Sequence, residues 1–270
     1  MQATTRGLTA EPLARDTAHF GRPVGRIDVG RDDSDLAEAL TRAERDGLEL
    51  VYVFAPFEFE MSTDLLTRFD GLKVDDRAVF SIDIDGRAAG MTRGESVIVA
   101  EHPRSAPSRA LIDLALAAGE YSRFAVDPRI PIADFHRLYE IWIARSCRHE
   151  AADVVFIAQD SVAAGEPLGF ITAGVQDDAG VIGLVAVDSK ARRRGVGRAL
   201  MGRVHAWLAD RGVRRSTVVT QAANGPACSL YRACGYETSL RETIYHFRPR
   251  GFVGGGRVGD STEPGGIGGD

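Results

Sequence analysis

The sequence predicts a mixed α/β protein with a mostly antiparallel sheet. Two observations support this fold class: strand-like and helix-like segments alternate over residues 24–84, and three closely spaced strands precede a second alternation over residues 196–247. A chain of 270 residues can bury one large core or two small ones. Its 44% of hydrophobic and 26% of charged residues exclude a wholly disordered or collagen-like protein.

The first half of the chain is expected to form a β-α-β-α-β unit. In order, the pattern predicts a strand at 24–29, a helix at 32–45, a strand at 48–55, a helix at 62–69 and a long strand at 72–84. Leu36, Leu40 and Ala43 share one face of the first helix, and Gly47 ends it. A unit of this size cannot easily cover both faces of its sheet, so we expect it to pack against the rest of the chain.

The second half is expected to contain the larger unit. In order, we expect a helix at 108–118, a loop at 121–132, a helix at 134–148, strands at 153–159, 168–175 and 181–187, a helix at 196–209, a strand at 216–221, a helix at 226–234 and a strand at 243–247. The last twenty residues are rich in glycine and are expected to be disordered. We therefore divide the chain into an N-terminal domain at 1–95, a connection at 96–120, a second domain at 121–250 and a tail at 251–270.

Composition narrows the classes of partner. A net charge of −5 argues against broad electrostatic binding of nucleic acid or of an anionic membrane surface.

Cys147, Cys228 and Cys234 are never spaced C-x-x-C, so we expect buried free thiols, no disulfide framework and no metal site. His136 and His205 form no ligand pattern. No apolar run approaches the ~20 residues that span a bilayer, and the first residues contain no hydrophobic signal core, so we expect a cytoplasmic protein.

Residues 181–200, VIGLVAVDSKARRRGVGRAL, carry the clearest chemical signal. A buried strand leads into a basic turn and then into a helix. Gly195 and Gly197 let the backbone approach a ligand closely, and the first N–H groups of the helix lack intrahelical partners. Four arginines add positive charge around this turn: Arg192, Arg193, Arg194 and Arg198. We expect a pyrophosphate to be held there, chiefly by backbone amides and the helix dipole.

Two other interpretations of this turn stay open. A dinucleotide-binding turn requires G-x-G-x-x-G/A, but Leu200 occupies the sixth position and the preceding strands are expected to be antiparallel. The turn can also be a solvated basic helix start that binds nothing.

Residues 192–197 match the R/Q-x-x-G-x-G/A motif, and residues 153–247 resemble the Gcn5-related N-acetyltransferase (GNAT) family. The segments TQAAN (220–224) and LYRACGY (230–236) extend the resemblance. It implies a GNAT fold with splayed central strands, and acetyl-CoA held between the strands at 181–187 and 216–221. Besides the arginines and glycines of the turn, it implies donor contacts with the following residues: Val185, Val187, Val196 and Asn224.

The resemblance also assigns roles in catalysis. Tyr231 matches the tyrosine that serves as general acid, and a backbone N–H near Val187 would stabilise the oxyanion. From periodicity alone, Tyr231 can equally be a core residue and Asn224 only a helix cap. Because neither Cys228 nor Cys234 has a paired histidine within sequence reach, we expect direct transfer without an acyl-enzyme.

Residues 11–21, 121–127 and 138–143 resemble one subgroup, the nucleotide-sugar N-acetyltransferases such as the TDP-fucosamine acetyltransferases. In that subgroup, a partial GNAT-like domain precedes the complete one. The resemblance implies a small-molecule acceptor, the 4-amino group of a TDP-linked 4-amino-4,6-dideoxyhexose. Two other functions stay open: acetylation of a protein N-terminus, lysine, polyamine or antibiotic, and a non-catalytic CoA-binding module.

Two residues are candidates on the acceptor side. Asp76 falls near an acidic position of the subgroup and is the candidate base for the amine, unless it is a solvated residue beside Asp75 and Arg77. Arg123 is a candidate for binding a phosphate or the sugar, or else a structural ion-pair partner. In the GNAT family the last strands leave an exposed sheet edge, so the resemblance also leaves room for a homodimer.

Overall fold

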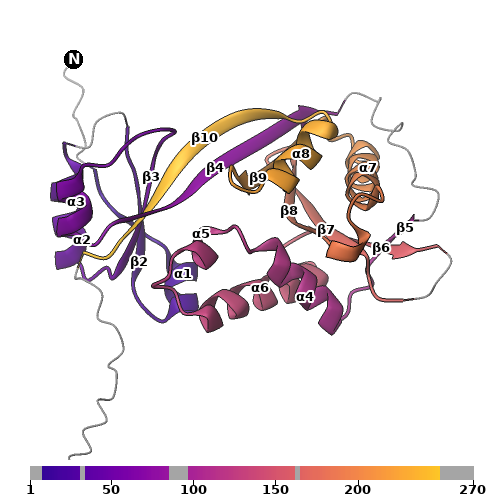
Figure 1. Ribbon diagram of the computed structural model, residues 1–270, viewed down its shortest axis with the longest axis horizontal. Coiled ribbons are helices and arrows are strands. Elements are labelled where there is room, and N and C mark those ends of the chain that lie inside the picture. Colours follow the sequence, from indigo (N-terminus) through magenta and orange to yellow (C-terminus); the bar gives the residue numbers. More distant parts are fainter. Residues whose placement is uncertain (1–7, 31–33, 85–96, 162–164, 250–270) are drawn as a thin grey trace, which may run out of the picture.

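In the part of the chain that the structure describes, one ten-stranded sheet runs through the molecule (Figure 1). The computed structural model describes residues 8–30, 34–84, 97–161 and 165–249. The strands are β1 (Glu11–Pro12), β2 (Val24–Asp28), β3 (Leu50–Pro56), β4 (Leu72–Asp83), β5 (Val97–Glu101), β6 (Val154–Asp160), β7 (Gly169–Gln176), β8 (Ala179–Val187), β9 (Arg215–Gln221) and β10 (Glu237–Phe247). The helices are α1 (Ala14–Phe20), α2 (Leu36–Arg45), α3 (Thr63–Arg68), α4 (Arg109–Ala118), α5 (Arg123–Val126), α6 (Ile132–Cys147), α7 (Val196–Ala209) and α8 (Gly225–Ala233), with a 3₁₀ turn at Ser189–Ala191.

The strand order joins the two halves of the chain. It is β1-β2-β3-β10-β4-β9-β8-β7-β6-β5, with parallel pairs at β2–β3 and β8–β9 and antiparallel pairs elsewhere. β10, from the second half, lies between β3 and β4, while β4, from the first half, lies between β9 and β10. The two long strands β4 and β10 run side by side across the molecule in Figure 1. The expected mixed α/β fold is confirmed, and the first half packs against the second by contributing a strand inside its sheet.

Helices cover both faces of this sheet. α7 and α8 pack on one face of β6–β9, and α4 and α6 pack on the other. Around β2 and β3, α2 and α3 lie on one face and α1 and α5 on the other. The uninterrupted apolar sequence of β3 follows from this arrangement, because Val51 and Val53 face one helical layer while Tyr52 and Phe54 face the opposite one.

Five differences from the sequence expectations concern short elements or strands that pair with distant segments. The segment expected to be a loop at 121–132 contains the single-turn helix α5, whose amphipathic pattern is too short to recognise. β1, α1 and β5 were not expected, and β10 begins at Glu237 rather than at residue 243. These strands are stabilised by pairing with distant segments, which local patterns do not reveal. The expected glycine-rich tail lies outside the described residues. No helix among the described residues is long and apolar enough to cross a membrane.

Candidate active site

Two parallel strands separate near the centre of the sheet. β8 and β9 pair from Gly180↔Ser216 to Ile182↔Val218, and their printed pairing ends there although both strands continue. A bulge follows directly in β8, where residues 183 and 184 together oppose Thr172 of β7. Thr172 Oγ1 accepts a hydrogen bond from the Leu184 N–H at 2.8 Å, so this N–H keeps a partner although the bulge interrupts the backbone hydrogen bonds between β7 and β8. The expected splay between the two strands is confirmed.

The N–H groups of Val185 and Val187 point into this splay. The Asp188 N–H donates to the Leu168 C=O beside β7 at 2.8 Å. Because N–H groups alternate between the two edges of a strand, those of Val185 and Val187 face the opposite edge, from which β9 has separated. A donor in this position can stabilise a negatively charged oxygen that develops between the strands.

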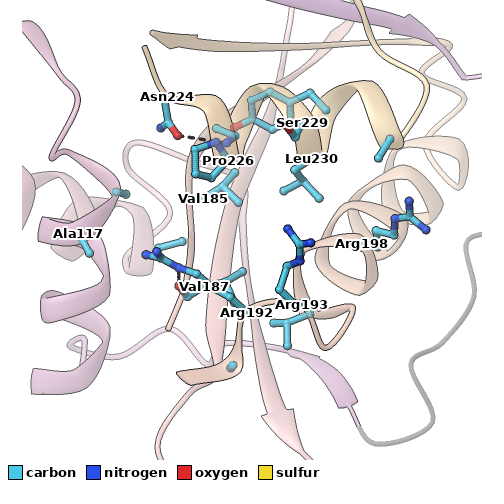
Figure 2. Close-up of a pocket in the computed structure, with 18 of the residues that line it drawn as sticks. Ala117, Val185, Val187, Arg192, Arg193, Arg198, Asn224, Pro226, Ser229 and Leu230 are labelled. Atoms are coloured by element: carbon cyan, nitrogen blue, oxygen red, sulfur yellow. Dashed lines mark hydrogen bonds between the residues drawn. The ribbon is translucent and has the colours of Figure 1, made fainter. Parts of the chain in front are cut away.

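A pocket of about 800 Å³ lies at the splay, between β8, the start of α7, and α8 (Figure 2). Apolar side chains such as Val185 and Leu230 form its walls, and Arg192 and Arg193 extend into it from the turn before α7. The structure brings these sequence-predicted residues together in its lining: Val185, Val187, Arg192, Arg193, Gly195, Val196, Gly197, Arg198, Asn224 and Tyr231. Four further lining residues come from α4 and the segment after it, which the sequence did not link to the site: Ala117, Ala118, Glu120 and Tyr121.

The turn before α7 presents backbone N–H groups to this pocket. The Ala199 N–H bonds to the Gly195 C=O at 3.0 Å, so the N–H groups of residues 196–198 precede the first intrahelical bond. No side chain caps this helix end. Arg193 (φ 65°) and Gly195 (φ 81°) both adopt the left-handed backbone region, which favours a concave set of N–H groups. Together with the helix dipole and the arginine side chains, this turn has the chemistry of an anion site.

Gly197 permits α7 and α8 to approach one another. A Cβ atom at this position would lie 3.0 Å from a terminal carbon of the Leu230 side chain, a contact tighter than side chains normally make. The two glycines therefore act differently: Gly195 allows the backbone conformation of the turn, and Gly197 allows the close contact between helices that form the pocket.

Tyr231 lies on α8 and contributes to the pocket lining, although its side chain is almost fully buried. Its ring packs 5.6 Å from Phe80 and 6.1 Å from Tyr236, so it is also part of the core, as periodicity alone suggested. Its hydroxyl forms no hydrogen bond with any residue that the structure describes. Burial, and then the neighbouring thiols Cys228 and Cys234, raise the pKa of Tyr231 above its ordinary value. The hydroxyl therefore stays protonated at neutral pH and is able to donate a proton.

Asn224 and Arg194 have structural partners. Asn224 is the N-cap of α8, because its Oδ1 accepts a hydrogen bond from the Ala227 N–H at 3.1 Å (Figure 2). Its amide nitrogen donates no hydrogen bond to any described residue and is available to a ligand in the pocket. Arg194 does not line the pocket, and its guanidinium pairs instead with Asp160 on β6 at 3.0 Å. Of the four arginines expected around the anion, three lie in the lining.

Asp76 is not brought to the pocket. Its carboxylate accepts a hydrogen bond from Thr243 Oγ1 at 2.9 Å and pairs with Lys73 Nζ at 3.0 Å. Thr243 shares a strand face with Tyr245, which packs in the cluster under α2 and α3. Asp76 therefore lies on the face of the sheet away from α5 and α6, and its two partners satisfy it there. These contacts favour the structural alternative for Asp76 over the role of base.

The neighbouring Asp75 faces the other way and was missed. It is buried on β4, where the charge of Arg123 on α5 and the side chain of Gln221 on β9 act on it. Burial raises the pKa of its carboxyl to about 7, although Arg123 and Gln221 oppose this shift. A β-bulge between Ile244 and Tyr245 of β10 interrupts the regular alternation beside Asp75, so counting along the strand could not have separated it from Asp76.

Arg123 lies half-buried among aromatic rings next to this carboxyl. Its guanidinium carbon is 4.6 Å from the centre of Tyr52 and 4.4 Å from the centre of Phe124. Its Nε, the Tyr52 hydroxyl and His246 Nε2 are buried polar atoms without a hydrogen-bond partner among the described residues. Buried polar atoms are nearly always satisfied, so such a group of unsatisfied atoms is typical of a ligand or water site. The alternative of a structural ion pair for Arg123 finds no carboxylate partner in the described part of the chain.

The three cysteines and His205 offer no competing chemistry. Cys147, Cys228 and Cys234 are free and buried, and burial raises the pKa of all three thiols, to about 11 for Cys147 and Cys234. They are therefore protonated and poor nucleophiles at neutral pH. His205 is a satisfied core residue that bonds to the Tyr236 hydroxyl at 2.8 Å. The described residues contain no group of three or more His, Cys, Asp or Glu side chains that could hold a metal ion.

Comparison with known proteins agrees with this geometry. Residues 122–236 match the acetyltransferase (GNAT) family. A functionally unknown conserved protein from Staphylococcus epidermidis is similar in structure, with a TM-score of 0.64 at 10% identity over 92% of this chain and 94% of that one. A GCN5-related N-acetyltransferase from Sphaerobacter thermophilus has a TM-score of 0.56 at 19% identity over 90% and 77%. A tandem GNAT protein from the clavulanic acid biosynthesis pathway has a TM-score of 0.51 at 14% identity over 85% and 76%. No curated protein sequence matches the chain significantly.

The splayed sheet, the turn with free N–H groups and the pocket between them form one continuous site. The family match shows that residues 122–236 form a GNAT acetyltransferase domain, and this domain gives the enzyme class, an N-acetyltransferase. At the identities found, the similar structures support the fold alone. The GNAT fold implies acetyl-CoA as the acyl donor.

Proposed function

We propose that this N-acetyltransferase moves the acetyl group of acetyl-CoA directly onto the primary amine of a nucleotide-linked amino sugar. The observation that carries the donor side is the pocket at the splay, lined by unpaired backbone N–H groups and by three arginines. These groups fit the pyrophosphate of CoA, and the apolar walls at Val185 and Leu230 fit its pantetheine arm. The thioester then lies near the open edge of β8.

The chemistry follows from what surrounds that edge. The N–H groups of Val185 and Val187 stabilise the oxyanion of the tetrahedral intermediate, and the free hydroxyl of Tyr231 protonates the departing sulfur. Direct transfer is supported by the raised pKa values of the thiols, because no described cysteine is activated as a nucleophile. Ping-pong kinetics with a trapped acyl-cysteine would contradict this part of the proposal.

An anionic acceptor is supported by Arg123. A half-buried guanidinium that has no carboxylate partner among the described residues and stacks on Tyr52 and Phe124 is suited to a phosphate or carboxylate, and the aromatic rings are suited to a sugar or a base. The narrower identification, the 4-amino group of a TDP-linked deoxysugar, depends on the resemblance of residues 121–127 and 138–143 to that subgroup. A polycationic acceptor such as a polyamine is disfavoured by the positive charge of Arg123.

Thiol release from acetyl-CoA tests the proposal across TDP-linked 4-amino sugars, free amino sugars, polyamines and peptides with free N-termini. The TDP-linked sugars should give the highest kcat/KM, and Arg123→Met should raise their KM without changing that of acetyl-CoA. A polyamine or peptide as the best acceptor would contradict the assigned acceptor class. Tight CoA binding without thiol release for any acceptor would favour a CoA-binding module instead.

A further inference from the structure

We propose that Asp75 is the general base that removes a proton from the acceptor's ammonium group, an assignment that rests on the acetyl transfer proposed above. The reaction needs such a group, because an ammonium nitrogen has no lone pair with which to attack a thioester. Three independent features of Asp75 support the assignment: its position along the sheet, the face to which it points, and its surroundings.

Asp75 lies beside the open end of the splay. On β4, its neighbour Arg77 pairs with Gln221, and the Asp76 C=O accepts a hydrogen bond from the Ala222 N–H at 2.7 Å. This register puts Asp75 next to the C-terminal end of β9. Gln221 belongs to the part of β9 beyond its last pair with β8, and its side chain also acts on the Asp75 carboxyl. Asp75 is not itself among the residues that line the donor pocket; the register places it beyond the end of β9, beside the edge where the thioester is expected.

Asp75 and Tyr231 lie on opposite faces of the sheet. Tyr231 packs with Phe80 in the cluster that α7 and α8 share with β4. Asp75 interacts with Arg123 of α5 and with Tyr139 of α6, which cover the other face. A base and an acid that approach the splay from opposite faces can serve the two ends of the reaction separately. The amine would be deprotonated on the α5 side, and the sulfur would be protonated on the α8 side.

The surroundings keep this carboxyl reactive. Asp75 is 8% exposed and makes no ion pair with any described residue, in contrast to Asp76. The groups whose charge or hydrogen bonding acts on it are Arg123 and Tyr139 from the helices, Gln221 from β9, and its strand neighbours Asp76, on the opposite face, and Arg77. Burial is the largest influence and raises the pKa to about 7, while Arg123 limits the rise. A base whose pKa lies near the working pH is available as carboxylate and still takes up a proton readily.

The proposed sequence balances protons and bonds. The ammonium passes one proton to an Asp75 oxygen, which yields a neutral amine and a carboxylic acid. The amine nitrogen bonds to the thioester carbon, the C–S bond breaks, and the sulfur takes the Tyr231 hydroxyl proton. The second proton on the new amide nitrogen returns to the tyrosinate. Asp75 then releases its proton to water, so ammonium and acetyl-CoA yield amide, free CoA and one proton.

The test compares Asp75→Asn with Asp76→Asn over pH 5.5 to 9.5, using acetyl-CoA and the best acceptor of the panel. The wild type should show kcat rising with pH through an inflection near 7. Asp75→Asn should lose that inflection, fall by roughly 10²–10⁴-fold at pH 7, and recover towards pH 9.5 as the acceptor becomes neutral in solution. Asp76→Asn should keep the inflection and most of kcat, and both variants should bind CoA like the wild type.

If Asp75→Asn keeps the rate and pH profile of the wild type, Asp75 is not the base. Thiol release by the wild type would then still support acetyl transfer. Should no acceptor release thiol from the wild type, the proposed function itself fails. A second measurement does not depend on turnover or on the variant's activity: ¹³C NMR of aspartate carboxyls in the wild type. A resonance titrating near 7 that is missing from Asp75→Asn supports the proposal, and an Asp75 resonance titrating near 4 would overturn it.

Discussion

Replacing Tyr231 by Phe separates a catalytic hydroxyl from a core ring. The ring contacts with Phe80 and Tyr236 are kept, and the hydroxyl has no hydrogen bond to lose with any residue in the described ranges. The free energy of unfolding should therefore change by less than about 1 kcal/mol. Removal of a general acid, in contrast, typically lowers the rate by roughly 10²–10⁴-fold, which is about 3 to 5 kcal/mol of activation free energy.

Tyr236→Phe is the matched control for this substitution. The Tyr236 hydroxyl bonds to His205 and to Ser216 Oγ, each at 2.8 Å, so its loss should destabilise the protein by about 1–3 kcal/mol with little effect on kcat. Thermal unfolding and thiol release should then show opposite patterns for the two variants, with an unchanged KM for acetyl-CoA in Tyr231→Phe. A Tyr231→Phe variant with a kcat within threefold of the wild type would show that the hydroxyl is not the acid, and a variant that unfolds would show that the hydroxyl has a structural role instead.

Three further predictions concern the turn, the helix contact and acid stability. Arg193→Gln should weaken CoA binding by about 1.5–3 kcal/mol, measured by titration. Arg194→Gln should leave CoA binding unchanged, because Arg194 is paired with Asp160. Equal losses for the two variants would contradict the different roles given to these arginines. Gly197→Ala should lower the melting temperature, and adding Leu230→Ala should relieve the clash, so that a double-mutant cycle is non-additive; additive losses would argue against the contact. Burial lowers the pKa of His205 to about 4, so below pH 6.5 the unfolded chain binds more protons than the folded protein. Up to about 3 kcal/mol of the free energy of unfolding should therefore be lost as the pH falls from 6.5 to 4. If the stability of His205→Gln falls with pH as steeply as that of the wild type in this range, His205 is not the cause.

The donor turn was predictable from the sequence because it is local. The spacing of Gly195, Gly197 and the arginines contains nearly all the information about a strand, a turn and a helix start, and the structure places them together. The sequence could not reveal that Arg194 pairs with Asp160, because Asp160 lies on another strand, far from the turn in sequence. The sequence indicated Tyr231 as a residue of the helix beside the site. Whether its hydroxyl has a hydrogen-bond partner could not be predicted, because its neighbours come from distant segments.

The acceptor side depends on pairing that no local pattern reveals. β10 lies between β3 and β4, and β4 reaches the splay only because it also pairs with β9. Asp75 and Asp76 are adjacent acids whose sequence neighbourhood is nearly the same, and their different faces and partners follow from this long-range register. The sequence could thus indicate an acidic residue on this strand, whereas the choice between the two required the fold.

The account depends most on one claim, that the turn before α7 and the open edge of β8 bind the acyl donor. Amide hydrogen exchange with and without saturating CoA measures this directly. CoA should slow exchange at the N–H groups of residues 196–198, and the acetylated donor should also slow it at Val185 and Val187. Unchanged exchange at the turn, with protection elsewhere in the chain, would contradict the donor site and with it the proposed reaction.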